Sequence, residues 1–256
     1  MEIITSRRNP LCMHIKKLGE SRSYRYGNGE FLCDGLKLLE EAIGCGVYVS
    51  TVLTAEDIPF PLPNGVRVCS ADRTLLDSLS PLKNAQSLLF VCRMPAIGND
   101  VPVAKAVEET FFLLDGIQDP GNVGAIFRSA LAFSISGLIM AGACADPYNP
   151  KTIRASMGAV FKQRFYTPDY SELEKLRADG AVFAGASPGA SSNDISETSL
   201  TGKIIAIGSE GCGLSDEIQA LCSENVKIPI ASGCESLNAA VAASILMWEA
   251  TQKCRL

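Results

Sequence analysis

The chain has 256 residues, 47% of them hydrophobic and 20% charged, a composition typical of a globular protein with one large domain or two ordinary ones. The longest apolar runs are too short to span a bilayer, and no apolar signal core follows Arg7 and Arg8, so we expect a cytoplasmic protein. The net charge of −5 gives no overall attraction to nucleic acid.

The ten cysteines are scattered singly without a Cys-x-x-Cys pair, and His14 is the only histidine. This composition predicts reduced thiols that behave as small apolar side chains, and no zinc or other metal site. It also disfavours nucleophilic chemistry that depends on a Ser-His-Asp or Cys-His arrangement.

The first 94 residues predict a small α/β domain, because short apolar runs alternate with helical patterns. Residues 95–105, rich in Pro, Gly, Asn and Asp, are expected to form a linker. The segment from Arg7 to Arg25 is locally basic and contains Tyr24, which suits either RNA binding or a solvated amphipathic helix. The predicted elements are helices at 9–19, 36–43 and 71–80, and strands at 31–33, 47–54, 66–70 and 87–92.

Residues 106–256 predict a second α/β domain, whose alternating pattern favours a mostly parallel sheet covered on both faces. The Ser/Ala/Gly-rich segment 187–199 is expected to form a mobile surface loop. The last helix is almost wholly apolar from Ala239 to Trp248, so it is either buried or provides a subunit interface. The predicted strands are 110–114, 137–141, 161–166, 181–186, 203–208 and 227–229, and the helices are 123–133, 150–156, 172–178, 215–221 and 238–253.

The run from Gly208 to Asn238 is the richest in candidate site residues. An apolar strand ends in Gly-Ser-Glu-Gly, where small residues allow a ligand to approach the backbone, and the sequence Ile228-Pro229-Ile230 follows. This glycine-rich loop lacks the lysine of a phosphate-binding loop. The pattern predicts a pocket for a nucleotide-like ligand that is not held by its phosphates.

A second candidate segment begins with Asp119-Pro120-Gly121 after the strand at 110–114. Asn122 suits a helix N-cap, and Arg128 lies six residues later, about 120° around the helix from Asn122. Capping asparagines and solvated arginines are common, so these residues alone favour a structural role over a functional one.

These segments together resemble the SpoU (TrmH) family of RNA ribose 2′-O-methyltransferases. The pattern Asn-x-Gly-x-x-x-Arg after Asp-Pro-Gly is similar to the first family motif, Ile153–Phe161 to the second, and Gly208–Asn238 to the third. All three occur in the family's order and spacing across about residues 110–250.

The resemblance implies a knotted α/β domain that binds S-adenosylmethionine and acts as a homodimer. It places Gly208, Ile228 and Leu237 in the cofactor pocket and gives Arg128 the central role in the reaction, as a base or as an electrostatic stabiliser. Glu210 has a second interpretation as a carboxylate favoured by a helix N-terminus. The other implied catalytic residues, expected to orient Arg128 and the ribose, are Asn122, Glu210, Ser236 and Asn238, and the two halves of the site are expected to meet across the dimer interface.

Residues Phe31–Ala42 resemble the opening of the ribosomal-protein-like RNA-binding domain that precedes many catalytic domains of this family, with Asp34 in place of the usual glutamate. This likeness favours ribosomal RNA over tRNA as the substrate. The implied RNA-binding residues are Arg7, Arg8, Asn9 and Arg25.

The sequence therefore predicts an S-adenosylmethionine-dependent RNA ribose 2′-O-methyltransferase that acts on ribosomal RNA. The alternatives are a tRNA 2′-O-methyltransferase, or a non-catalytic RNA-binding or ribosome-assembly protein with the same fold. A nicotinamide-dependent oxidoreductase also fits the strand–helix alternation, but the G-x-G-x-x-G fingerprint after the first strand is missing.

Overall fold

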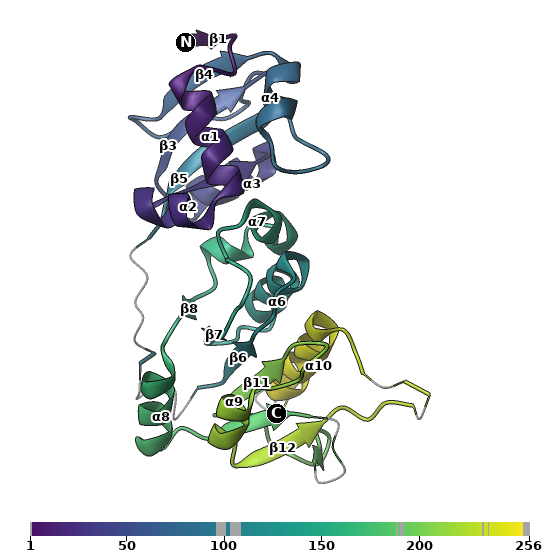
Figure 1. The fold of residues 1–256 in the computed structure, drawn as a ribbon. Helices are drawn as coiled ribbons and strands as arrows, with labels where there is room; N and C mark the ends of the chain where they lie inside the picture. Colours follow the sequence, from purple (N-terminus) through teal and green to yellow (C-terminus); the bar gives the residue numbers. More distant parts are fainter. Residues whose placement is uncertain are drawn as a thin grey trace. The chain divides into compact units, whose positions relative to one another are not determined.

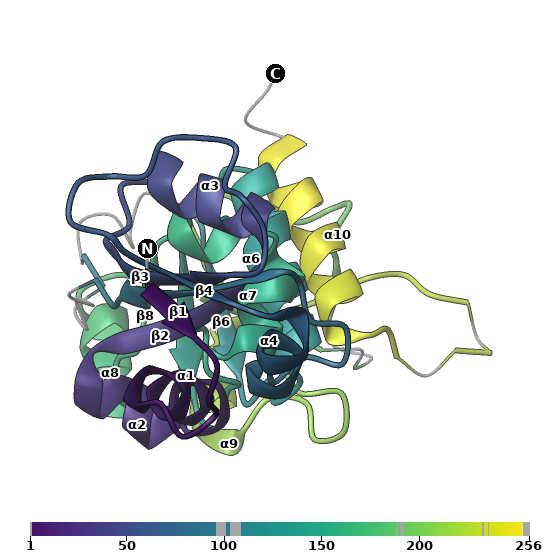
Figure 2. The same ribbon diagram turned by 90° about the horizontal axis from the view of Figure 1, so that it is seen from above.

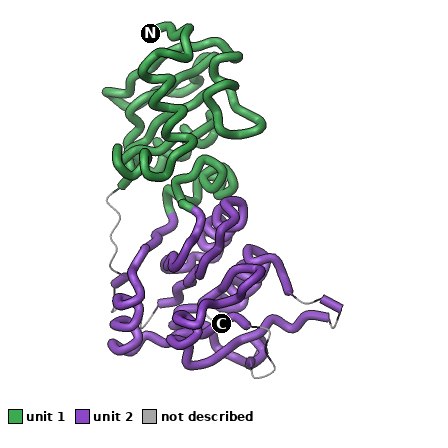
Figure 3. The backbone as a smooth tube through the Cα atoms, viewed as in Figure 1, with its two compact units in different colours: residues 1–96, 146–162 green, residues 97–145, 163–256 purple. Residues whose placement is uncertain are grey.

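The computed structural model describes residues 2–95, 101–102, 109–187, 189, 192–231, 233–234 and 236–252. Unit 1 comprises residues 1–96 and 146–162, and unit 2 comprises residues 97–145 and 163–256 (Figure 3). Residues 146–162 therefore cluster with the N-terminal part of the chain. Most of the linker predicted at 95–105 lies outside the described residues.

Unit 1 is built on a mixed five-stranded sheet with the order β1-β4-β3-β5-β2 (Figure 1). β5 runs antiparallel to both β2 and β3, whereas β4 runs parallel to β1 and β3. Helices α1 and α4 contribute to the core on the sheet through Leu18 and Leu76. The strands are β1 (Glu2–Ile4), β2 (Glu30–Asp34), β3 (Val49–Thr54), β4 (Arg67–Ala71) and β5 (Leu88–Arg93), and the helices are α1 (Pro10–Glu20), α2 (Arg22–Asn28), α3 (Leu36–Gly44) and α4 (Arg73–Leu79).

Helix α1 shows why the sequence prediction is confirmed over most of unit 1. The Asn9 side chain accepts a hydrogen bond from the Leu11 amide, and Pro10 occupies the first turn. Two elements were not predicted. The three-residue β1 is too short to show an alternating pattern, and α2 has too few apolar residues to show a helical one. The bounds of α2 are set by its caps, Ser21 at its start and the left-handed Gly29 at its end.

The segment 146–162 packs within unit 1 through a buried ion pair. The Arg25 guanidinium is 2% exposed and donates to Asp146 Oδ2 at 2.9 and 2.6 Å, and to the Leu18 carbonyl at 2.7 Å. The Tyr26 hydroxyl donates to Asp146 Oδ1 at 3.1 Å. Burial, with the nearby Asp146 charge, raises the pKa of Tyr26 to about 12, so this phenol remains a donor at neutral pH. Both Asp146 oxygens are thus satisfied.

The same segment contains α7 (Pro150–Ser156) and the 3-10 turn η1 (Ala159–Phe161), and it makes two further polar contacts with unit 1. Arg154 donates to the Asn84 carbonyl at 2.6 Å, and Lys162 pairs with Glu41 at 2.8 Å. Helix α7 was predicted with its observed bounds, whereas the strand predicted at 161–166 was wrong for its first four residues. Gly158, with φ +86°, turns the chain into η1 there.

Unit 2 contains a seven-stranded sheet with the order β10-β12-β9-β11-β6-β7-β8, and every neighbouring pair is parallel. The predicted parallel sheet is therefore confirmed, with α6 and α10 packed side by side (Figures 1 and 2). The strands are β6 (Phe111–Asp115), β7 (Gly137–Ala141), β8 (Phe165–Tyr166), β9 (Phe183–Ala186), β10 (Asn193–Asp194), β11 (Ile204–Gly208) and β12 (Glu224–Lys227), and the helices are α6 (Pro120–Ala132), α8 (Tyr170–Ala178), α9 (Asp216–Leu221) and α10 (Ala239–Gln252).

Two strand predictions in unit 2 need correction. β12 ends at Lys227, where the predicted strand 227–229 begins, and β10 lies within the segment predicted as a mobile loop. Both strands are very short and pair with each other, so their local patterns are weak. The strand order does not establish the threading of the chain, and the knot stays a prediction. Among the described residues, no helix is long and apolar enough to cross a membrane.

We predict that Arg25→Ala lowers the free energy of unfolding by about 3–5 kcal/mol, because it leaves the buried Asp146 carboxylate without its counter-ion. Chemical denaturation monitored by circular dichroism measures the loss. Lys16→Ala is the control, since it removes an exposed pair with Glu20 at 4.0 Å, worth below about 1 kcal/mol. Equal losses in the two variants would contradict a structural role for the buried pair.

Candidate active site

A cavity of about 350 Å³ lies where the loops after β11 and β12 approach α10. The lining includes the three predicted cofactor-binding residues, Gly208, Ile228 and Leu237. Glu210 and Ser236 also line it. The volume falls within the roughly 300–1,000 Å³ of small-molecule sites. Tertiary structure therefore brings together five of the residues that the sequence selected.

Gly208 is required by the chain's own backbone. The loop after β11 folds back so that Ser209 and Gly213 exchange two backbone hydrogen bonds, at 3.1 and 2.9 Å. A Cβ atom at Gly208 would lie 2.0 Å from the Gly213 carbonyl carbon and 2.3 Å from the Leu214 nitrogen. The close approach expected of a ligand is therefore made here by the protein itself, and the small residue shapes the cavity wall.

A carboxylate joins three distant segments at one edge of the cavity. Glu210 Oε1 accepts hydrogen bonds from Asn122 Nδ2 at 2.9 Å, from Asn238 Nδ2 at 2.6 Å and from the Ala239 amide at 3.2 Å. Asn238 Nδ2 also donates to Asn122 Oδ1 at 3.1 Å. We call Asn122, Glu210 and Asn238 the polar triangle. It connects α6, the glycine-rich loop and the start of α10 within one chain.

The polar triangle also corrects two sequence predictions. Asn122 is not the N-cap of α6; that residue is Asp119, whose side chain accepts from the Asn122 amide at 2.8 Å. Because the helix begins three residues earlier, the Asn122 side chain is available to Glu210. Asn122 and the glycine-rich loop also meet within a single chain, so this part of the site does not need a dimer interface.

Helix α10 begins at the polar triangle. Asn238 Oδ1 accepts from the amides of Ala240 and Val241 at 3.0 and 3.3 Å, which satisfies two donors of the first turn. Glu210 accepts the amide of Ala239, the first residue of α10. The interpretation of Glu210 as a helix-terminal carboxylate therefore agrees with the structure, and the helix concerned is α10.

Arg128 and Ser236 are less engaged than the sequence predicted. Arg128 is exposed on α6, and its guanidinium forms no hydrogen bond or ion pair within the described part of the chain. Ser236 is exposed, and its carbonyl accepts from Cys234 Sγ at 3.2 Å. Three of the residues expected to orient Arg128, namely Asn122, Glu210 and Asn238, are hydrogen-bonded to one another instead.

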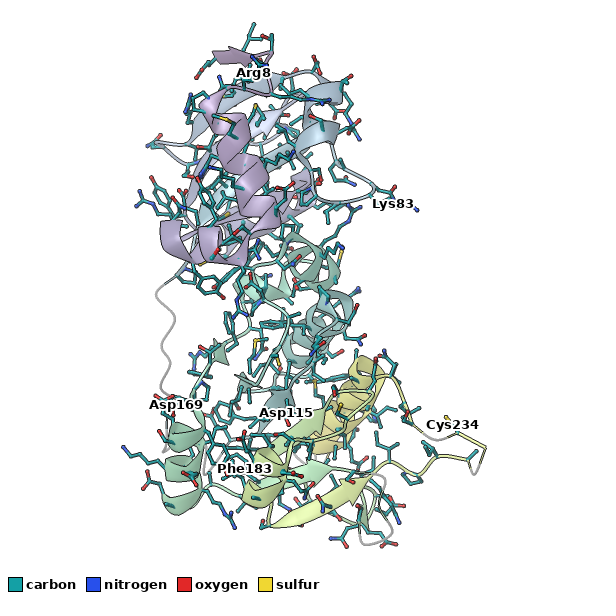
Figure 4. The ribbon with its side chains drawn as sticks, viewed as in Figure 1. Arg8, Lys83, Asp115, Asp169, Phe183 and Cys234 are labelled. Atoms are coloured by element: carbon teal, nitrogen blue, oxygen red, sulfur yellow. The ribbon has the colours of Figure 1, made fainter. Side chains whose placement is uncertain are left out.

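The predicted RNA-binding residues divide into two groups. Arg7 and Arg8 are exposed, and Asn9 caps α1 (Figure 4 labels Arg8). Arg25 is buried, with its donors directed to Asp146 and Leu18, which argues against a contact with RNA phosphates. The basic composition of the segment did not distinguish a buried arginine from exposed ones.

A second hollow, of about 500 Å³, lies between α6 and α10. Its lining includes Ala125, Val241, Ile245 and Trp248, together with two residues of the polar triangle. Val241 and Trp248 are each 48% exposed. The apolar sequence of 239–248 indicated this surface, and the part of the chain that the structure describes leaves Val241 and Trp248 on one face of α10 exposed.

Two thiols in unit 2 are unsuited to nucleophilic chemistry. Burial raises the pKa of the Cys144 thiol and raises that of Cys222 to about 11. Both thiols also donate to backbone carbonyls, Cys144 to Leu114 and Cys222 to Ile218. The raised pKa keeps both thiols protonated at neutral pH. They are therefore poor nucleophiles, because the thiolate is the reactive form.

Comparison with known proteins assigns the arrangement to a family. Residues 109–248 match the model of the SpoU rRNA Methylase family. The chain belongs to this family. It is 29% identical over 255 residues to the 23S rRNA (guanosine(2553)-2′-O)-methyltransferase RlmP of Bacillus subtilis, covering 97% of this chain and 98% of that protein. It is 31% identical over 268 residues to the 23S rRNA (uridine(2479)-2′-O)-methyltransferase of Streptomyces viridochromogenes, covering 98% and 92%.

Solved structures of family members share the fold over nearly the whole chain. The SpoU methyltransferase AviRb from Streptomyces viridochromogenes, in complex with the cofactor AdoMet, has a TM-score of 0.83 at 30% identity, covering 97% of this chain and 99% of that one. The AdoMet-bound rRNA methyltransferase from Sinorhizobium meliloti has a TM-score of 0.83 at 26% identity, covering 98% of both chains. The predicted family and α/β fold class are confirmed.

We predict that Gly208→Ala destabilises the SpoU domain by more than about 3 kcal/mol, the upper end of ordinary overpacking, because the added methyl group collides with backbone atoms. Urea denaturation measures the loss. Gly211→Ala, in the same loop, is the matched control, since a Cβ there meets nothing within 4 Å. Similar stabilities for the two variants would contradict the proposed constraint on Gly208.

Proposed function

We propose that the protein is an S-adenosylmethionine-dependent methyltransferase that modifies a ribose 2′-hydroxyl of ribosomal RNA. One observation carries the proposal: Asn122 of the first family motif meets Glu210 and Asn238 of the third at the edge of a cavity large enough for a small-molecule cofactor. The relatives described above are named as 23S rRNA 2′-O-methyltransferases, and neighbouring structures contain AdoMet.

The cavity suits the proposed cofactor in its chemistry. Ile228 and Leu237 supply apolar surface, and the glycine-rich loop offers backbone groups. No lysine follows Gly208 in that loop, which fits a cofactor without phosphates. S-adenosylmethionine supplies a methyl group already activated on a sulfonium, so the protein's task is to align the acceptor and assist loss of its proton.

Arg128 is assigned to the RNA ribose that accepts the methyl group rather than to the cofactor. Free arginine has a pKa above 12 and is a poor base, so its first role is to bind phosphate and stabilise the developing alkoxide. Glu210 Oε1 accepts three hydrogen bonds, one each from the Asn122 and Asn238 side chains and one from the Ala239 amide, and this engagement favours a positioning role over proton transfer. Ser236, at the cavity lining, is assigned to orienting the ribose.

We further propose that two chains pair over the uncovered face of α10. Trp248 and Val241 expose apolar surface there, and Arg128 has no partner among the described residues of its own chain. Pairing over this face would cover the apolar side chains and allow Arg128 of one chain to serve the cavity of the other. The same proposal includes a cytoplasmic location, which the bacterial relatives named for 23S rRNA support.

The N-terminal domain, residues 1–94, is proposed to bind the RNA, with the catalytic domain extending over 106–256. Arg7 and Arg8 are exposed at the start of this region, and Asn9 lies beside them. Tyr24 and Tyr26 are stacked with Lys17 and Arg22, each cation 5.4 Å from its ring centroid. Exposed cations beside the exposed ring of Tyr26 and the half-buried ring of Tyr24 suit contacts with RNA phosphates and bases.

We predict that Arg128→Ala lowers methyl transfer at least 100-fold, the size of a lost preorganised charge contact in a transition state. Transfer of labelled methyl from S-adenosylmethionine to ribosomal RNA transcripts measures the effect, with tRNA transcripts as the competing substrate class. The control is Lys175→Ala on α8, another exposed cation of unit 2. Full activity of Arg128→Ala would remove this residue from the mechanism.

A second prediction concerns the dimer. Trp248→Glu places a charge in the proposed interface and should shift the protein toward monomers in analytical ultracentrifugation at micromolar concentration. Met13→Glu is the control, because Met13 is similarly exposed, at 49%, on α1. A wild-type monomer, or an unchanged dimer in Trp248→Glu, would contradict pairing over α10.

A further inference from the structure

Asp115 is a buried carboxylate for which the proposed reaction has no role. It ends β6 in the middle of the seven-stranded sheet and is 7% exposed (Figure 4). Its Cα pairs in register with that of Gly208, the last residue of β11. Burial of a carboxylate is costly without hydrogen-bond partners, so its contacts indicate what the residue does.

The principal contact fixes the end of the glycine-rich loop. Asp115 Oδ2 accepts a hydrogen bond from the Ser215 amide at 2.6 Å. Ser215 is also the N-cap of α9, where its hydroxyl oxygen accepts from the Ile218 amide at 3.3 Å. Residues 209–214 therefore leave β11 at Gly208 and end at a point anchored on the neighbouring strand β6.

The turn after β7 leaves room for the second carboxylate oxygen. Gly142, with φ +61°, follows β7, and a Cβ built there would lie 3.2 Å from Asp115 Oδ1. This left-handed backbone position and the tight contact both favour glycine. Glycine at position 142 thus leaves space for the Asp115 carboxylate, whose other oxygen accepts from the Ser215 amide.

The anchored loop supplies much of the cavity. Five of its residues line the cavity, and one of them, Glu210, is the centre of the polar triangle. A charged acceptor makes a stronger hydrogen bond than a neutral one, so the Asp115–Ser215 contact is a firm attachment. The lining residues are Ser209, Glu210, Gly211, Cys212 and Gly213.

We infer that Asp115 is a positioning residue, whose carboxylate holds the 209–214 loop in the conformation that binds the cofactor. It acts through Ser215 and contacts neither reactant. The inference rests on the proposed function, because the cavity must take S-adenosylmethionine. Without the anchor the loop would sample other conformations, and the population competent to bind the cofactor would fall.

The test compares Asp115→Ala and Asp115→Asn with the wild-type protein by isothermal titration with S-adenosylmethionine. Losing a hydrogen bond to a charged group should weaken binding by Asp115→Ala about tenfold to a hundredfold. Asp115→Asn should bind with intermediate affinity, because its amide oxygen can still accept from Ser215. KM for the cofactor should rise in parallel, while kcat at saturating cofactor stays within about threefold of wild type.

Asp34→Asn is the matched control. Asp34 is also a buried strand-end carboxylate, 4% exposed, and it accepts from the Ser80 hydroxyl at 2.6 Å and the Gln86 amide at 2.9 Å. It lies in unit 1 and does not line the cavity. We expect Asp34→Asn to lower the melting temperature and leave the affinity for S-adenosylmethionine unchanged.

Hydrogen exchange without cofactor separates the possible failures. The Ser215 amide should exchange slowly in the wild type and faster in Asp115→Asn, together with residues 209–214. Wild-type affinity in Asp115→Asn and Asp115→Ala would overturn the inference, as would unchanged exchange at Ser215. If the wild type itself does not bind S-adenosylmethionine, the proposed function fails, and the exchange data still decide whether Asp115 holds the loop.

Discussion

The arrangement of the candidate site depends on one carboxylate oxygen. Glu210 Oε1 collects donors from Asn122 on α6, from Asn238 and from the first amide of α10. Asn122 lies 88 positions before Glu210 in the chain, and Asn238 lies 28 positions after it. A charged acceptor satisfied by three donors holds three segments in one geometry, which also fixes the edge of the cavity.

The sheet provides the support that this contact needs. β11 lies between β9 and β6, so the glycine-rich loop leaves the sheet at its centre. Gly208 allows the loop to fold tightly against its own backbone, and Asp115 holds the far end on the next strand. A loop attached at both ends to a buried parallel sheet can present Glu210 with little freedom, as a preorganised site requires.

A buried ion pair organises unit 1. Arg25 and Asp146 form an ion pair in which both side chains are buried, and the Tyr26 hydroxyl donates to the other oxygen of Asp146. This pair attaches the segment that carries the second family motif to the N-terminal part of the chain. The contact explains why residues 146–162 belong to unit 1, although the sequence predicts a single domain over residues 106–256.

Local sequence by itself determined much of this protein. Turn residues and apolar periodicity predicted most helices and strands, because caps such as Asn9 and buried stripes act over a few positions. Motif spacing predicted the family and identified residues that line the cavity. Only the tertiary structure decided which side chains pair: it buried Arg25, directed Asn122 to Glu210 and left Arg128 exposed. The physical reason is that hydrogen bonds between distant segments depend on strand order and on which polar side chains become buried, and neither leaves a local pattern in the sequence.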